Sequence, residues 1–116
     1  MDAGKKELLE NKGFDVDGAM RRFLNNDGLY TKCLKKFLDD TSYEKLKEAY
    51  DTGNCNEAFK AAHTMKGFVA NLGINSLYNL LIPMVEKLRV QDMNIASEME
   101  QLETLYHEAY DVIGNL

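Results

Sequence analysis

The stretch that decides the fold is AAHTMKGFVANLG, residues 61–73. It lies in a longer segment whose apolar side chains recur every three or four positions, which is the period of one face of an α-helix. At about 100° per residue, His63 points roughly 130° away from the centre of that face. We therefore predict an amphipathic helix over about 55–72 that carries an exposed histidine and ends at Gly73, a residue able to take the left-handed conformation. The predicted buried stripe comprises Ala58, Ala62, Met65, Val69 and Leu72.

The face that His63 shares is not that of an ordinary solvated helix. It combines two cations, exposed apolar groups and one missing side chain, from Asn56, Phe59, Lys60, Lys66, Gly67 and Ala70. A glycine in a helix interior costs about 1 kcal/mol relative to alanine, which indicates a steric reason for Gly67. One turn after His63, a side chain at that position would lean over the imidazole.

Composition restricts the class of protein. The chain has 116 residues, of which 45% are hydrophobic and 28% charged, so we expect one soluble globular domain over residues 1–116. A single proline and the long stretches without turn residues favour an all-helical fold. The net charge of -5 argues against a nucleic-acid partner. No apolar run has the length of a membrane span or a signal peptide, so we expect no membrane association and a cytoplasmic location.

The N-terminal region predicts a helical cap over about residues 5–25. A first helix is expected over about 5–11, packed across the outside of the domain. A short helix should follow that carries Ala19 and Phe23, with Asp15 or Asp17 as its N-terminal cap.

The bundle core is predicted over about residues 27–115. Asp27 should cap a helix that runs to about Asp40, with a basic outer face. Thr41 or Ser42 begins a second helical stretch, 43–51, and Glu44 follows Thr41 at capping-box spacing. The sequence leaves open whether these are one kinked helix or two.

Two more helices complete the pattern. Asn75 or Ser76 should cap the first of them, and Pro83 must either kink it or leave the Asn79 carbonyl without its usual partner. The last segment has a regular stripe, formed by Ile95, Met99, Leu102, Tyr106, Ala109, Ile113 and Leu116. Long helices joined by short turns lie antiparallel, so we predict an all-α, antiparallel up-down four-helix bundle with additional short N-terminal helices.

The motif His63-Thr64-Met65-Lys66-Gly67, followed by Ala70-Asn71-Leu72-Gly73, resembles the signature of histidine-containing phosphotransfer (HPt) domains. The order and length of the predicted helices are similar to that family over most of residues 14–113. The resemblance implies a multistep two-component phosphorelay. His63 would accept a phosphoryl group from a receiver-domain aspartate and pass it to another receiver.

The residue chemistry is compatible with that role. An imidazole has an ordinary pKa of about 6.5, so its neutral, nucleophilic form is available near pH 7. A helix interior offers no free backbone N–H groups to an anion, so nearby side chains must stabilise the phosphoryl group. Lys66 is the best placed of these, and Lys60 is a second candidate from the helical wheel alone.

Asn56, Phe59 and Ala70 would form the docking surface for a partner, although the N-terminal helices could instead cover Phe59. Asn71 and Gly73 are interpreted as helix-ending residues. The resemblance implies receiver domains and a hybrid histidine kinase as partners, with the metal ion and the acidic cluster supplied by the receiver. We expect a monomer, because the relay needs the His63 face open. We expect a freestanding chain, because the domain follows closely after Met1.

Other functions have less support. An adaptor or inhibitor that docks receiver or kinase domains without being phosphorylated is the alternative, and the presence of Lys66 and Gly67 beside His63 argues against it. No nucleotide-binding glycine loop is present, so neither autonomous kinase activity nor a cofactor is expected. Cys33 and Cys55 lack metal-ligand and redox-motif spacing, and we predict no metal site. His107 is predicted to be a surface residue of the acidic last helix.

Overall fold

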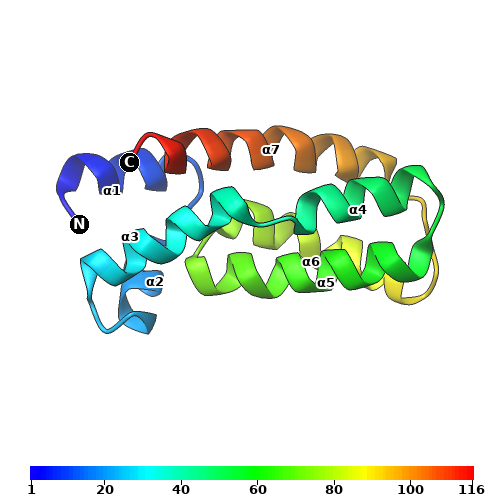
Figure 1. The fold of residues 1–116 in the computed structure, drawn as a ribbon, viewed down its shortest axis with the longest axis horizontal. Coiled ribbons are helices and arrows are strands. Elements are labelled where there is room, and N and C mark those ends of the chain that lie inside the picture. Colours follow the sequence, from blue (N-terminus) through cyan, green and yellow to red (C-terminus); the bar gives the residue numbers. More distant parts are fainter.

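The computed structural model describes all residues, 1–116, and is helical almost throughout (Figure 1). The helices are α1 (Ala3–Glu10), α2 (Val16–Arg22), α3 (Asp27–Lys36), α4 (Ser42–Asp51), α5 (Cys55–Leu72), α6 (Asn75–Arg89) and α7 (Ala96–Gly114), with a 3-10 turn, η1 (Phe37–Asp39), between α3 and α4. The predicted all-α fold is confirmed.

Four rods lie side by side in an elongated bundle that measures 43 × 23 × 21 Å. The first rod is α3, η1 and α4 in succession, and the others are α5, α6 and α7. Contacts follow the ring α4 to α5, α5 to α6, α6 to α7, and α7 back to η1 and α3. Neighbouring rods run in opposite directions, joined by short turns (Figure 1).

The predicted apolar stripes form the core. All five stripe residues of α5 are buried, and so are six of the seven on the last segment, with Leu116 half-buried at the end. They belong to one cluster of 28 buried hydrophobic residues. The apolar side of α5 packs against α4 and α6, and this packing fixes the rotation of the helix about its axis.

The N-terminal helices close one end of the bundle. α1 packs on α7, and α2 packs on α3 and α5. Between them the chain turns at residues 11–13, and Phe14 then forms an antiparallel bridge with Ile74 in the turn after α5. The backbone N–H of Asp15 donates to the carbonyl of Gly73 at 2.7 Å. Backbone hydrogen bonds thus attach the segment between α1 and α2 to the turn between α5 and α6.

Two of the expected capping arrangements are wrong. Asn26, not Asp27, caps α3 by accepting from the Leu29 N–H at 3.0 Å. Thr41 occupies the N-cap position of α4, but its side chain makes no capping bond. The Asp40 carboxylate instead accepts from the backbone N–H of Ser42 at 3.1 Å. The backbone at Asp40 is extended and ends η1, which places its carboxylate beside the first turn of α4. The extended residue also separates α3 from α4, so these are two helices.

The start of α6 also differs from the prediction. Neither Asn75 nor Ser76 caps it, because the N-cap position is the buried Ile74. The N–H of Ser76 donates to the carbonyl of Gly13 at 3.1 Å, so the N-terminal segment supplies the acceptor that a side chain would otherwise provide. At the start of α2 the two predicted candidates are resolved: Asp15 caps the helix, accepting from Gly18 at 3.0 Å.

Pro83 lies inside α6, which is continuous from Asn75 to Arg89. Proline has no N–H to donate to the carbonyl of Asn79, which is an exposed residue. The helix therefore passes its proline without being broken.

Candidate functional site

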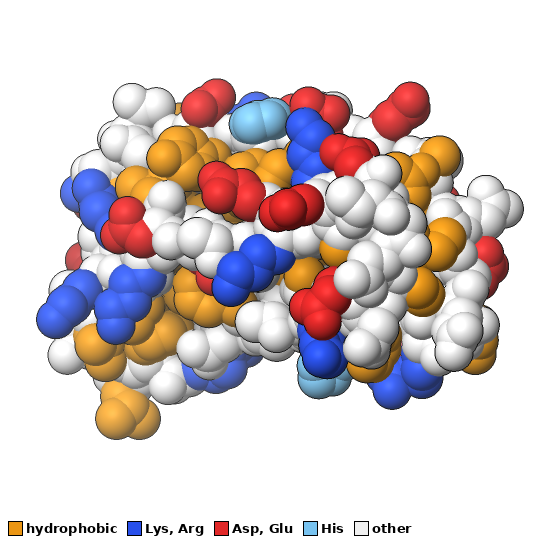
Figure 2. All heavy atoms as spheres, turned by 45° about the vertical axis from the view of Figure 1, so that its right-hand side comes forward, with side chains coloured by type: hydrophobic (Ala, Val, Ile, Leu, Met, Phe, Trp, Pro, Cys, Tyr) orange, Lys and Arg blue, Asp and Glu red, His pale blue; other side chains and the backbone are white.

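The helix that carries His63 begins and ends where the sequence predicts. Asn54 caps its N-terminus by accepting from the Glu57 N–H at 3.1 Å, and Gly73 ends it in the left-handed conformation with φ of 74°. His63 is exposed and forms neither a hydrogen bond nor an ion pair within the chain. The two histidine side chains of the protein lie at opposite edges of the surface in Figure 2. The imidazole of His63 is therefore accessible to a partner.

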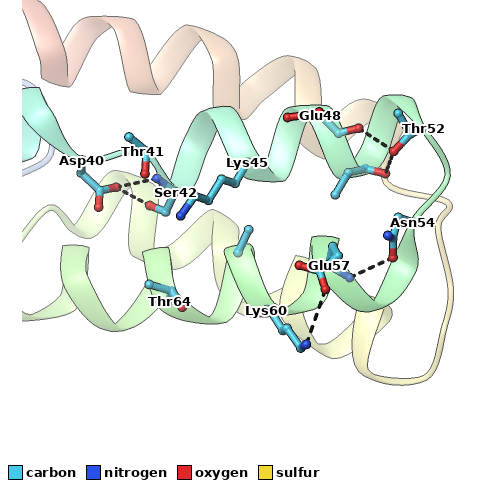
Figure 3. A pocket seen from close by; sticks show the side chains of 12 residues that line it. Asp40, Thr41, Ser42, Lys45, Glu48, Thr52, Asn54, Glu57, Lys60 and Thr64 are labelled. Carbon is cyan, nitrogen blue, oxygen red and sulfur yellow. Dashed lines mark hydrogen bonds and ion pairs between the residues drawn. The ribbon is translucent and has the colours of Figure 1, made fainter.

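The two predicted cations differ in their surroundings. Lys66 is half-buried and has no carboxylate within ion-pair distance. Lys60 is exposed, and its Nζ lies 3.5 Å from Oε1 of Glu57. Figure 3 shows Lys60 directed away from α4, toward Glu57. Lys66 thus has an ammonium group free for an added anion, whereas the charge of Lys60 is partly balanced.

The space beside Gly67 is open. A Cβ atom built at this position meets no other atom within 4 Å, including those of the His63 side chain. An alanine here would not press on the unmodified imidazole. Any clearance that Gly67 provides is for a group added to His63 or for a partner that lies across the helix.

Phe59 connects His63 with α6. Its ring centroid lies 5.8 Å from that of His63, and the guanidinium carbon of Arg89 lies 5.1 Å from the same phenyl centroid. Phe59, Asn56 and Leu88 line a shallow groove of about 410 Å³. The expectation that the N-terminal helices could cover Phe59 is wrong, because those helices meet α5 at its other end, where Arg22 hydrogen-bonds the carbonyls of Ala70 and Asn71.

Ala70 lies on the same face of α5 but is separated from Phe59 by about 16 Å of helix. It is half-buried, and its carbonyl accepts a hydrogen bond of 2.8 Å from Nη2 of Arg22. Asn56 and Phe59 line one groove on the N-terminal side of His63 along α5, and Ala70 lies on its C-terminal side. The three candidate docking residues therefore flank His63 along the helix.

A second groove separates α4 from α5 (Figure 3). Its volume is about 530 Å³, and most of the residues that line it are polar or charged. Lys45 reaches from α4 toward α5, and Thr64, the residue after His63, lines the same groove. This groove borders the His63 face on the side away from Phe59.

The second histidine has different neighbours. His107 packs edge-on against the rings of Tyr43 and Tyr106, with centroid distances of 6.4 and 5.6 Å. Burial raises the pKa values of both tyrosines. No lysine or arginine forms an ion pair beside His107.

Cys33 and Cys55 are free, half-buried thiols, and no three His, Cys, Asp or Glu side chains gather where they could hold a metal ion. None of the helices combines the length and apolar character that a membrane span requires.

Arg89, which packs on Phe59, is the residue of this site that sequence reasoning missed. The helical wheel of α5 identifies the residues that share its own face, but it gives no information about which side chains a neighbouring helix contributes. Ile82 and Tyr78 precede Arg89 by seven and eleven residues, so all three share one side of α6. Ile82 is 39% exposed, which is unusual for isoleucine and extends the apolar character of this side.

A family model described as "Hpt domain" matches residues 34–112. The matched region begins within α3 and ends within α7, and it includes His63 and the whole of α5 and α6. No solved structure matches the chain.

Proposed function

This chain belongs to the Hpt domain family, and on that premise we propose that His63 is the phosphoryl acceptor and donor of a multistep phosphorelay. The family implies histidine phosphotransfer in phosphorelays. The observation that carries the assignment to His63 is its exposure on α5, one turn from the unpaired Lys66 and from the open space at Gly67.

The proposed step moves one phosphoryl group. A lone pair on an imidazole nitrogen of neutral His63 attacks the phosphorus of an aspartyl phosphate on a receiver domain. The N–P bond forms, the aspartyl O–P bond breaks, and the carboxylate leaves with the electron pair. The second ring nitrogen keeps its proton, which solvent can remove afterwards. In the reverse step the second ring nitrogen regains a proton from solvent, an aspartate of another receiver attacks the phosphorus, the N–P bond breaks, and neutral imidazole leaves.

Side chains on the same face stabilise the anion that results. Lys66 supplies an ammonium group without a competing carboxylate, and this supports its role as the main phosphoryl partner. Lys60 contributes a second positive charge, reduced by its pair with Glu57. Gly67 leaves room for the phosphoryl oxygens above the helix.

The docking surface consists of Asn56, Phe59 and Ala70, which flank His63 along α5. Apolar contacts on both sides of the nucleophile would hold a receiver with its phosphoaspartate in line with the imidazole. We propose receiver domains and a hybrid histidine kinase as the partners of this face, and a monomer as the working form. A stable dimer that buried His63 would contradict this arrangement.

Incubation with a radiolabelled phospho-receiver tests the function. The chain should gain label that is lost in acid and stable in base, as expected for an N–P bond. His63→Gln should abolish uptake, whereas His107→Gln, the matched variant at the other histidine, should retain it.

Uptake by His63→Gln would refute the site. Stable binding of a receiver by the wild-type chain without any uptake of phosphate would refute the transfer function and favour a docking adaptor.

A further inference from the structure

Arg89 is held beside the candidate site by an aromatic contact. Its guanidinium carbon lies 5.1 Å from the centroid of Phe59, whose ring lies 5.8 Å from that of His63. An arginine stacked on an aromatic face keeps its N–H donors in the plane of the guanidinium, directed outward from the ring. Phe59 thus contacts both a cation from α6 and the imidazole from α5.

The guanidinium of Arg89 is free to bind another anion. Its only carboxylate neighbour is Glu86, with Oε1 at 3.5 Å from Nε of Arg89, and both side chains are about half exposed or more. The two terminal NH₂ groups make no hydrogen bond within the chain. The N–H donors of both terminal groups, which suit paired oxygens on a phosphoryl group, are therefore unused.

The position of Arg89 relative to the other cations is set by the packing of α5 on α6. The thiol of Cys55 lies 3.5 Å from the carbonyl of Leu88, so the C-terminal end of α6 lies against the first turns of α5. On the α5 wheel, Phe59 and Lys66 lie on one side of His63 and Lys60 on the other. Arg89 therefore joins the side of His63 that holds the unpaired Lys66.

We propose that Arg89 is a third phosphoryl-binding cation, which acts with Lys66 and is positioned by Phe59. Its N–H groups donate to the phosphoryl oxygens once His63 is phosphorylated, and they stabilise the phosphorylated chain relative to the free one. This inference rests on the proposed function, because it needs phosphohistidine at position 63. It assigns Arg89 to the phosphoryl group itself and not to the surface of the receiver.

Phosphorylation by phosphoramidate tests the inference without a partner. In that reaction the His63 nitrogen attacks phosphorus, the N–P bond of the reagent breaks, and ammonia leaves. ³¹P NMR then follows the phosphohistidine of wild type, Arg89→Gln and Arg89→Lys as the pH is varied. Arg89→Gln should raise the pKa of the phosphoryl group and move its chemical shift, and Arg89→Lys should restore part of both changes. Arg21→Gln, a change of the same kind on α2, should match wild type.

A second measurement separates phosphoryl binding from docking. The equilibrium constant for transfer between His63 and a receiver aspartate depends only on the free and phosphorylated forms of the separate proteins. Arg89→Gln should shift it toward the phospho-receiver by about fivefold, the factor for loss of one exposed charge-assisted contact.

If Arg89→Gln slows transfer but changes neither the equilibrium constant nor the ³¹P titration, Arg89 acts in docking and the proposal is overturned. Identity with wild type in all three measurements also overturns it. Failure of the wild-type chain to form phosphohistidine at position 63 would instead overturn the proposed function.

Discussion

Replacing Gly67 with alanine should make the protein more stable and a poorer phosphoryl acceptor. Gly67 lies in the middle of α5, is exposed, and has no atom within 4 Å of an added Cβ. The substitution therefore carries no steric cost in the free chain and gains the helix propensity of alanine, about 1 kcal/mol in the free energy of unfolding. With an unfolding entropy of about 2.1 cal/mol/K per residue over 116 residues, the melting temperature should rise by about 4 °C.

The same methyl group should obstruct transfer. It projects from α5 one turn from His63, on the face that a receiver must approach. A displacement of the reacting groups by about 1 Å can cost up to roughly a hundredfold in rate, so we expect a loss of ten- to a hundredfold. Gly67→Leu should lose more, because a longer side chain reaches over the imidazole.

Thermal unfolding followed by circular dichroism measures the first effect, and quench-flow transfer from a phospho-receiver measures the second. Gly114→Ala, at the end of α7 and also in open space, is the control and should transfer at the wild-type rate. A Gly67→Ala variant that melts below wild type would contradict the expected gain in helix propensity at this position. Wild-type transfer by both the alanine and the leucine variants would refute the clearance role.

Two further predictions concern the N-terminal end of the bundle. Gly73→Ala should lower the free energy of unfolding, measured by denaturant titration, by about 3 kcal/mol or more. A left-handed alanine is strained, and its Cβ would lie 2.6 Å from the Asp15 carbonyl oxygen. Gly53→Ala is the control: it has the same φ of 74° but lies in open space, so it should lower the free energy of unfolding by only about 1 kcal/mol. Lys6 and Asp17 form an ion pair, with Nζ and Oδ1 2.8 Å apart, which lowers the pKa of the Asp17 carboxyl and raises the pKa of the Lys6 ammonium. The contribution of this pair to the free energy of unfolding should be present at neutral pH. It should fall as the pH drops through the lowered pKa of Asp17, and also as the pH rises through the raised pKa of Lys6. NMR titration of the Asp17 carboxyl in wild type and Lys6→Gln measures this, and equal pKa values in the two proteins would contradict it.

The limits of α5 are a property of local sequence. An asparagine before the helix, a stripe with a regular period, and a glycine able to take φ of 74° after it specify both ends and the rotation of the helix. The error at the start of α6 has the opposite origin. At α6 the N–H of Ser76 is satisfied by the carbonyl of Gly13, a residue more than sixty positions away in the chain, and no local pattern contains that bond.

The sequence by itself determined that this chain is a helical bundle and that His63, Lys66 and Gly67 share an outward face, because helical periodicity depends only on spacing along the chain. The tertiary structure decided what lies beside that face. The packing of α6 on α5 places Arg89 over Phe59, and the attachment of α1 and α2 at the far end of α5 leaves Phe59 uncovered. Which side chains meet between two helices depends on which faces of those helices pack together. That packing is set by the burial of all the apolar stripes in a single core, so it cannot be read from one helix alone.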